Sequence, residues 1–189
     1  MSKKHYLLIL VLLTNGCASL LPKANTDSAG FKSFDDAKAA FETLEPMKSR
    51  RSALEKSGFD PARHPNTFIL THADVVRRFV PSALLVREDL DPGILVCLKA
   101  RDTCRGLEIN VAKVARVRTG NFFADFFNFK RRTETTGWRF NATVLLVDDL
   151  VVYRTWGGQP VIQETELTRN PLGPLQDIGP ATVNTNKGF

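Results

Sequence analysis

The hydrophobic period of the chain changes near Pro92-Gly93, and this change limits the folds that the sequence can adopt. Before this point, apolar residues recur every three to four positions, as in amphipathic helices; after it, apolar and polar residues alternate, as in strands. Helices that precede a set of antiparallel strands are typical of an α+β domain. The sequence therefore predicts N-terminal helices packed on one face of a three- to four-stranded antiparallel sheet.

Three helices are predicted before the change of period. Each begins at a residue whose hydroxyl can cap a helix, and two of these have an acid three positions later, as in a capping box. The expected capping residues are Ser33, Ser49 and Thr71, and the helices should end before Pro46, near Gly58 and before Pro81.

Four strands are predicted after the change of period at Pro92-Gly93, over residues 94–98, 107–118, 138–147 and 150–156. Asp148-Asp149 is a polar pair suited to a tight hairpin turn between the last two. Cys97 and Cys104 lie symmetrically about a predicted turn near residues 99–102. A disulfide between them would fasten that hairpin across its two strands.

The first seventeen residues have the layout of a bacterial lipoprotein signal. Lys3 and Lys4 precede an apolar run that is too short to span a bilayer, and small residues follow up to Cys17. Thr14 departs from the pattern, because such signals usually have Leu three positions before the cysteine. We expect residues 1–16 to be removed and Cys17 to carry the lipid; an ordinary cleaved signal and an uncleaved anchor are the alternatives.

Acylation of Cys17 would fix the protein to a membrane. One acyl chain binds only marginally, whereas two or three, palmitate among them, hold a protein in effect permanently. Ala18 follows the cysteine where an Asp usually signals retention in the inner membrane of Gram-negative bacteria. The sequence therefore predicts anchoring in the outer membrane through N-terminal acyl chains, on the periplasmic face.

The mature chain has room for one compact domain. Removal of the signal leaves 173 of the 189 residues. Residues 17–32 have no periodicity and are predicted to be a flexible tether. Residues 33–170 should form a single α+β domain, and residues 171–189 an extended C-terminal tail.

Charge and cysteine content exclude some classes of function. Loss of Lys3 and Lys4 lowers the 26 Lys and Arg residues to 24, against 20 Asp and Glu. This mild excess favours anionic lipid head groups over nucleic acid, and export argues against nucleic acid as well. Cys97 and Cys104 form an even pair, as expected for a disulfide in an oxidising compartment. The competing zinc site lacks clustered Cys/His ligands, so neither a metal nor a cofactor is expected.

No catalytic group is predicted. Asp148-Asp149 is the only adjacent carboxylate pair between strands, but neighbours in a two-residue turn do not converge on one substrate atom. His64 and His72, the histidines of the mature chain, have no Ser or Cys partner in view and are expected to be structural. The sequence predicts a protein that is not an enzyme.

A phenylalanine-rich segment is the most unusual feature of the mature chain. Five phenylalanines occur within residues 122–129, and three cations follow. The segment is a candidate contact with a partner or with lipid, through Phe122, Phe123, Phe126, Phe127, Lys130, Arg131 and Arg132. The alternative is a short helix whose rings are buried against the open side of the sheet.

Residues 46–61 resemble the helical signature of BamE-like (SmpA/OmlA) outer-membrane lipoproteins. Lys48-Ser49 stand at the Lys/Met-Thr positions, Leu54 is the apolar residue and Gly58 is the closing glycine. Residues 143–156 resemble the closing hairpin of the family. This chain departs from the family pattern at three positions: Met47 replaces the first glycine, Ser57 replaces the leucine, and Pro61 comes one position later than usual. The Cys97/Cys104 region and the phenylalanine-rich segment are not part of the family pattern.

The resemblance implies two helices on a three-stranded antiparallel sheet. It also implies a non-enzymatic accessory role in the outer-membrane β-barrel assembly machinery or another envelope complex. We therefore expect a non-catalytic protein-binding or assembly factor of the cell envelope. The alternatives are a surface or periplasmic lipoprotein that binds and inhibits an enzyme, and an envelope hydrolase.

Overall fold

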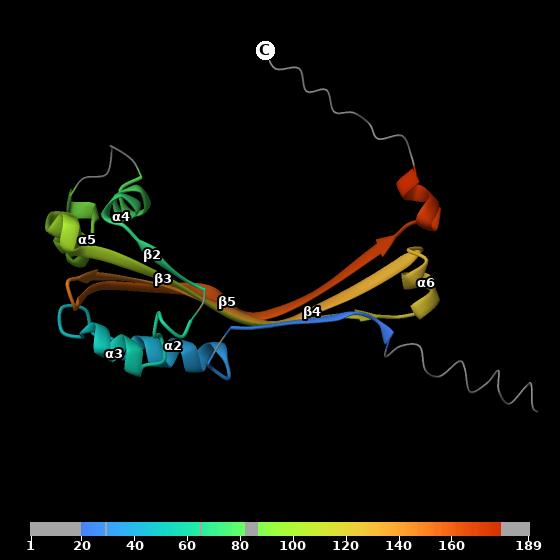
Figure 1. Cartoon of the computed structure of the whole chain (residues 1–189), viewed down its shortest axis with the longest axis horizontal. Coiled ribbons are helices and arrows are strands. Elements are labelled where there is room, and N and C mark those ends of the chain that lie inside the picture. Colours follow the sequence, from blue (N-terminus) through green and yellow to red (C-terminus); the bar gives the residue numbers. More distant parts are fainter. Residues whose placement is uncertain (1–19, 29, 65, 82–86, 179–189) are drawn as a thin grey trace, which may run out of the picture. The chain divides into compact units, whose positions relative to one another are not determined.

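The computed structural model describes residues 20–28, 30–64, 66–81 and 87–178 (Figure 1). The predicted signal, Cys17 and Ala18 lie outside the described residues. The chain divides into two compact units. The first unit comprises the N-terminal segment up to residue 24 with residues 115–135 and 163 onward, and the second comprises residues 25–114 and 136–162. Residues 33–170, predicted as a single domain, contribute to both units, and each unit is described by itself below.

The class is α+β, as predicted, with a five-stranded antiparallel sheet. Its strands are β1 (Lys23–Asp27), β2 (Thr67–Leu70), β3 (Cys104–Thr119), β4 (Lys130–Val147) and β5 (Leu150–Arg169). The hydrogen-bonded order is β1-β3-β4-β5, and β2 also pairs with β3. The sheet has more strands than predicted, because β1 forms within the expected tether and β2 has no counterpart in the sequence prediction.

The described helices are α2 (Phe34–Glu42), α3 (Arg51–Lys56), α4 (His72–Phe79), α5 (Pro92–Ala100) and α6 (Phe122–Phe126), with 3-10 turns η2 (Arg87–Asp89), η3 (Arg101–Thr103) and η4 (Gly173–Ile178). Two predicted caps are confirmed. Ser33 accepts a hydrogen bond from the Asp36 N–H, and Thr71 forms a reciprocal capping box with Asp74. The third is wrong, because α3 begins after Arg50.

In the second unit, α2 and α3 pack on one face of the sheet (Figure 1). The centre of this layer is aromatic: Phe41, Phe59 and Phe140 are fully buried, and the Phe41 and Phe59 rings meet edge to face at 5.4 Å. Alternate residues of β4, from Trp138 to Leu146, complete the core from the sheet side.

A second core lies on the opposite face of the same unit. Leu145 and Val152 of the sheet pack there with Val75 of α4 and with Ile94 and Cys97 of α5. The prediction of helices on one face only is therefore wrong. Residues 142–146 are all buried, because this stretch of β4 is covered on both faces, and its apolar run is typical of a strand in that position.

Residues 94–98, predicted as a strand, belong to helix α5. The Asp91 side chain accepts a hydrogen bond from the Gly93 N–H at 2.7 Å, and Pro92 occupies the first turn. Proline at the first helical position after an aspartate cap is a helix start, although Pro92-Gly93 also suits a turn. The predicted hairpin around residues 99–102 is consequently absent from the described chain.

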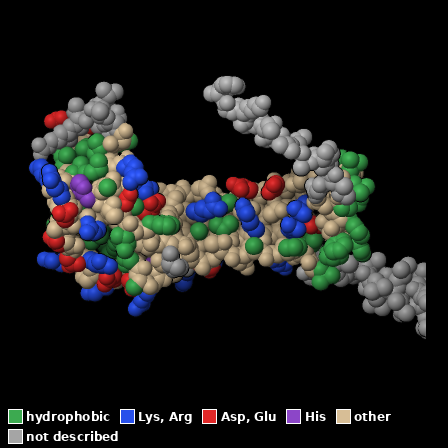
Figure 2. All heavy atoms as spheres, turned by 45° about the horizontal axis from the view of Figure 1, so that its top comes forward, with side chains coloured by type: hydrophobic (Ala, Val, Ile, Leu, Met, Phe, Trp, Pro, Cys, Tyr) green, Lys and Arg blue, Asp and Glu red, His purple; other side chains and the backbone are tan. Residues whose placement is uncertain are grey.

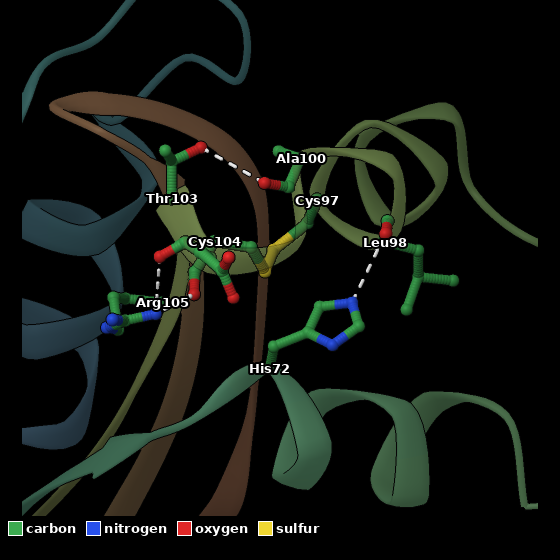
Figure 3. The surroundings of a disulfide bond; sticks show 8 residues. His72, Cys97, Leu98, Ala100, Thr103, Cys104 and Arg105 are labelled. Atoms are coloured by element: carbon green, nitrogen blue, oxygen red, sulfur yellow. Dashed lines mark hydrogen bonds between the residues drawn. A yellow bond between two sulfur atoms is a disulfide. The ribbon is translucent and has the colours of Figure 1, made fainter.

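Cys97 and Cys104 are paired at disulfide distance, with Cα atoms 5.1 Å apart and both side chains buried (Figure 3). The pairing was predicted, but its setting was wrong, because it connects α5 to the start of β3 rather than two strands. His72 of α4 donates from Nε2 to the Leu98 carbonyl at 3.2 Å. The disulfide and this hydrogen bond together fix α4 and α5 beside the sheet.

The predicted hairpin at Asp148-Asp149 is confirmed, with Asp148 at φ 53° in the turn. The last strand is longer than predicted, since β5 continues beyond Trp156 to Arg169. A Cβ at Gly158 would lie 2.2 Å from the Arg139 carbonyl oxygen, so glycine permits close approach to β4 at this point.

The disulfide closes a short loop, so its expected contribution to the free energy of unfolding is modest. A Cys97→Ser/Cys104→Ser double variant should lose about 2–3 kcal/mol of unfolding free energy, because the chain-entropy model gives that value for a loop of this length. Denaturant unfolding followed by far-UV circular dichroism measures the change. Adding a reductant to the parent protein should lower its unfolding free energy by the same amount. No loss of unfolding free energy in either comparison would contradict the expectation.

The capping box of α4 predicts a pH dependence. Hydrogen bonds from the Thr71 side chain and backbone, with Arg77 nearby, hold the pKa of Asp74 below its ordinary value of 3.8. Its stabilising effect is therefore complete above pH 3.8 and is lost as the pH falls through the lowered pKa. An Asp74→Asn variant should melt at a lower temperature than the parent at neutral pH, and the gap should close under acid. A gap independent of pH would show that the charge of Asp74 does not contribute.

Candidate functional site

Helix α6 carries most of the predicted contact segment and lies in the first unit, between β3 and β4. Gly120, at φ 114°, turns the chain out of β3, and the Asn121 side chain caps the helix by accepting from the Ala124 N–H at 3.0 Å. Asn128, at φ 58°, reverses the chain after the helix. The short helix foreseen from the sequence is present.

Asp125 sets the orientation of α6. Its carboxylate is buried, and Oδ1 accepts from Arg118 Nη1 of β3 at 3.1 Å while lying 3.8 Å from Arg131 Nε of β4. Successive helical residues are rotated by about 100°, so Phe123 lies on nearly the opposite side of α6 from Asp125. The inward carboxylate of Asp125 thus places Phe123 on the outward side of the helix.

The phenylalanines are exposed. Phe123, Phe126, Phe127 and Phe129 retain between 47% and 69% of their accessible surface, and Phe122 is half-buried. Neighbouring rings contact one another, with Phe122 and Phe126 stacked at 5.7 Å and Phe126 and Phe127 edge to face at 5.1 Å. The alternative in which these rings are buried against the sheet is wrong.

Two leucines of the same unit extend this surface. Leu172 and Leu175 are 63% and 66% exposed. The intervening Gly173 packs so closely on Phe129 that a Cβ there would lie 2.6 Å from the ring, and the Asn170 N–H donates to the Phe129 carbonyl. Figure 2 shows hydrophobic side chains gathered at this end of the first unit. We call Phe122, Phe123, Phe126, Phe127, Phe129, Leu172 and Leu175 the apolar tip.

Cations lie beside the apolar tip within the first unit. Lys130 is exposed, and Arg132 pairs with Glu134 at 3.0 Å. A shallow cleft of about 330 Å³ is lined by Lys23, Arg116, Arg118 and Arg131, with Glu166 as the acid among its lining residues. The cleft therefore has a positive lining that suits an anion.

The structure brings the predicted contact residues together, but the three cations among them have different surroundings. Arg131 lies near Asp125 and Arg132 pairs with Glu134, whereas Lys130 is exposed to solvent. The sequence prediction omitted Arg118, Asp125 and the leucines of the tip. Asp125 could have been recognised as a lone acid among phenylalanines, but the contribution of residues 172–175 depends on tertiary pairing.

The other candidate residues have structural contacts. His64 Nε2 donates to the Gly58 carbonyl, and His72 contacts α5 as described. Asp149 forms an exposed ion pair with Arg50 at 3.7 Å. Among the described residues, no group of three or more His, Cys, Asp or Glu side chains is placed to hold a metal ion.

Comparison with known proteins gives no relative. No family model, no curated protein and no solved structure matches this chain. Within the described part of the chain, no helix is both long enough and apolar enough to cross a bilayer.

The Asp125 ion pairs should stabilise the first unit. Asp125→Ala leaves Arg118 and Arg131 without their acid, and we expect a loss of about 1–3 kcal/mol, below the cost of breaking a fully buried pair because both arginines are about one third exposed. Hydrogen exchange at the amides of α6 measures this loss. The matched control is Glu134→Gln, which removes the charge of a half-buried acid but keeps an oxygen that can accept from Thr119, and it should cost under about 0.5 kcal/mol. Equal effects of the two variants would contradict the assigned role of Asp125.

Proposed function

We propose that this protein is a lipoprotein anchored in the outer membrane, facing the periplasm, and that it acts without catalysis as a protein-binding or assembly factor of the cell envelope. The observation that carries the proposal is the N-terminal layout ending in Cys17, followed by Ala18. A pair of buried cysteines at disulfide distance fits an exported protein, since such bonds persist in oxidising compartments.

The second unit offers a candidate surface for the protein partner. β2 is hydrogen-bonded to β3 and to no other strand of the described chain, and its Phe68 and Ile69 are 60% and 68% exposed. A short edge strand with exposed apolar side chains can bind an extended segment of another protein by strand addition. The resemblance to BamE-like lipoproteins makes the β-barrel assembly machinery the first partner to test.

Anchoring is tested by metabolic labelling with a palmitate analogue, comparing the parent with Cys17→Ala, followed by separation of inner and outer membranes. We expect label that requires Cys17 and that fractionates with the outer membrane. Unlabelled parent protein would contradict acylation, and labelled protein in the inner membrane would contradict the sorting inferred from Ala18.

The partner is tested by a photoreactive amino acid at position 68, with position 39, an exposed alanine of α2, as the matched control. Crosslinks from position 68 alone to barrel-assembly components are expected. Recovery of none of them, under conditions that retain known members of the machinery, would contradict this partner. Digestion of the protein by protease added to intact cells would instead favour the surface-exposed enzyme inhibitor.

A further inference from the structure

We propose that the apolar tip of the first unit inserts into the interfacial layer of the membrane that holds the acyl chains of Cys17, so that the protein contacts the bilayer at two places. The inference rests on the proposed anchoring for the identity of the membrane. It assigns to the phenylalanines a lipid partner rather than a protein.

The apolar tip is the kind of surface that binds a partner or a membrane. Contiguous exposed apolar patches are uncommon on soluble proteins and mark sites of contact with proteins, ligands or membranes. Here Phe122, Phe123 and Phe126 lie on the five-residue helix α6, which Asp125 holds, and neighbouring rings of the tip contact one another. The half-buried ion pair between Arg118 and Asp125 thus holds the helix on which Phe123 and Phe126 are exposed.

The position of the anchor points to the membrane as the covering partner. Leu21 is buried in the first unit, and the Pro22 carbonyl accepts from the Arg118 N–H at 3.2 Å. Three residues separate Leu21 from Cys17, so their Cα atoms lie at most about 14 Å apart. Arg118 also holds α6 through Asp125. The lipid-bearing residue is therefore connected by a short segment to the unit that carries the apolar tip.

The charges beside the tip favour anionic head groups. Residues 115–135 contain five Lys and Arg against two acids, and one of these acids is the buried Asp125. The positive cleft lies in the same unit. Apolar side chains flanked by cations are typical of surfaces that bind at the membrane interface. Two copies joined through their tips would instead bring like charges together.

The insertion is tested first on the full lipidated protein in vesicles of phosphatidylethanolamine and phosphatidylglycerol. In a Phe126→Trp variant, lipids brominated near the head of the acyl chain should quench the introduced tryptophan. Phe68→Trp is the control, because Phe68 has similar exposure but lies in the second unit. The native Trp138 and Trp156 provide the background measured in the parent protein. Equal quenching at positions 126 and 68 overturns the proposal.

The second test removes the anchor, so that its result does not depend on acylation. A chain starting at Ala18 retains every described residue. It should bind the same vesicles, bind phosphatidylcholine vesicles at least tenfold more weakly, and lose affinity as salt is raised. Phe123→Asp/Phe126→Asp should weaken binding at least tenfold, whereas Phe68→Asp/Ile69→Asp should leave it unchanged.

Three outcomes of this second test would overturn the proposal. They are absence of vesicle binding by the parent chain, equal loss in both double variants, and a concentration-dependent dimer that Phe123→Asp/Phe126→Asp dissociates, since this dimer would make a second copy the occupant. Inorganic phosphate at millimolar concentration should not displace the chain from vesicles; complete displacement would show a free-phosphate site instead of a membrane contact. Far-UV circular dichroism confirms that the variants remain folded.

Discussion

The burial of β4 on both faces is the constraint on which the second unit depends. Phe140, Val144 and Leu146 face the α2 and α3 layer, while Leu145 faces α4 and α5. A fully buried phenylalanine or leucine contributes about 1.5–3 kcal/mol, so the few residues between Phe140 and Leu146 hold two helical layers to one strand. The close approach of α5 to β5 supports this arrangement. A Cβ at Gly93 would lie 1.9 Å from the Val152 carbonyl oxygen, which means that the first turn of α5 rests on the backbone of β5.

The sequence predicts well those features that depend on neighbours in the chain. The caps at Ser33 and Thr71 and the turn at Asp148-Asp149 are local, and the structure confirms all three. The sequence predicts the fold less well where one local pattern fits two kinds of secondary structure. Asp91-Pro92-Gly93 suits both a turn and a helix start, and the apolar run over residues 94–98 suits both a strand and a helix packed against the sheet, which is its place in α5.

Tertiary pairing explains the remaining differences. β1 has no alternating pattern and all of its residues are exposed, so hydrogen bonding to β3 rather than burial makes it a strand. For the phenylalanines, residue type favours burial, whereas the ion pairs of Asp125 orient the helix that exposes Phe123 and Phe126. A lone acid amid aromatic residues was the only local indication of that outcome. Arg118, which pairs with Asp125, lies on β3 and has no signature in the sequence.

The tip and the edge strand β2 expose apolar side chains in different units of one chain. Because the two surfaces lie in different units, the proposed lipid contact and the proposed protein contact can be altered independently by substitution.

The buried cysteines have a consequence for the order of events in biogenesis. Cys97 and Cys104 have no accessible surface once α5 rests on the sheet. Thiol–disulfide exchange requires access to sulfur. An oxidant must therefore reach these thiols before the helix docks, while the chain is still emerging or only loosely folded. We therefore expect oxidation before α5 docks, and a chain that docked α5 with reduced thiols would keep them inaccessible until that helix opened again.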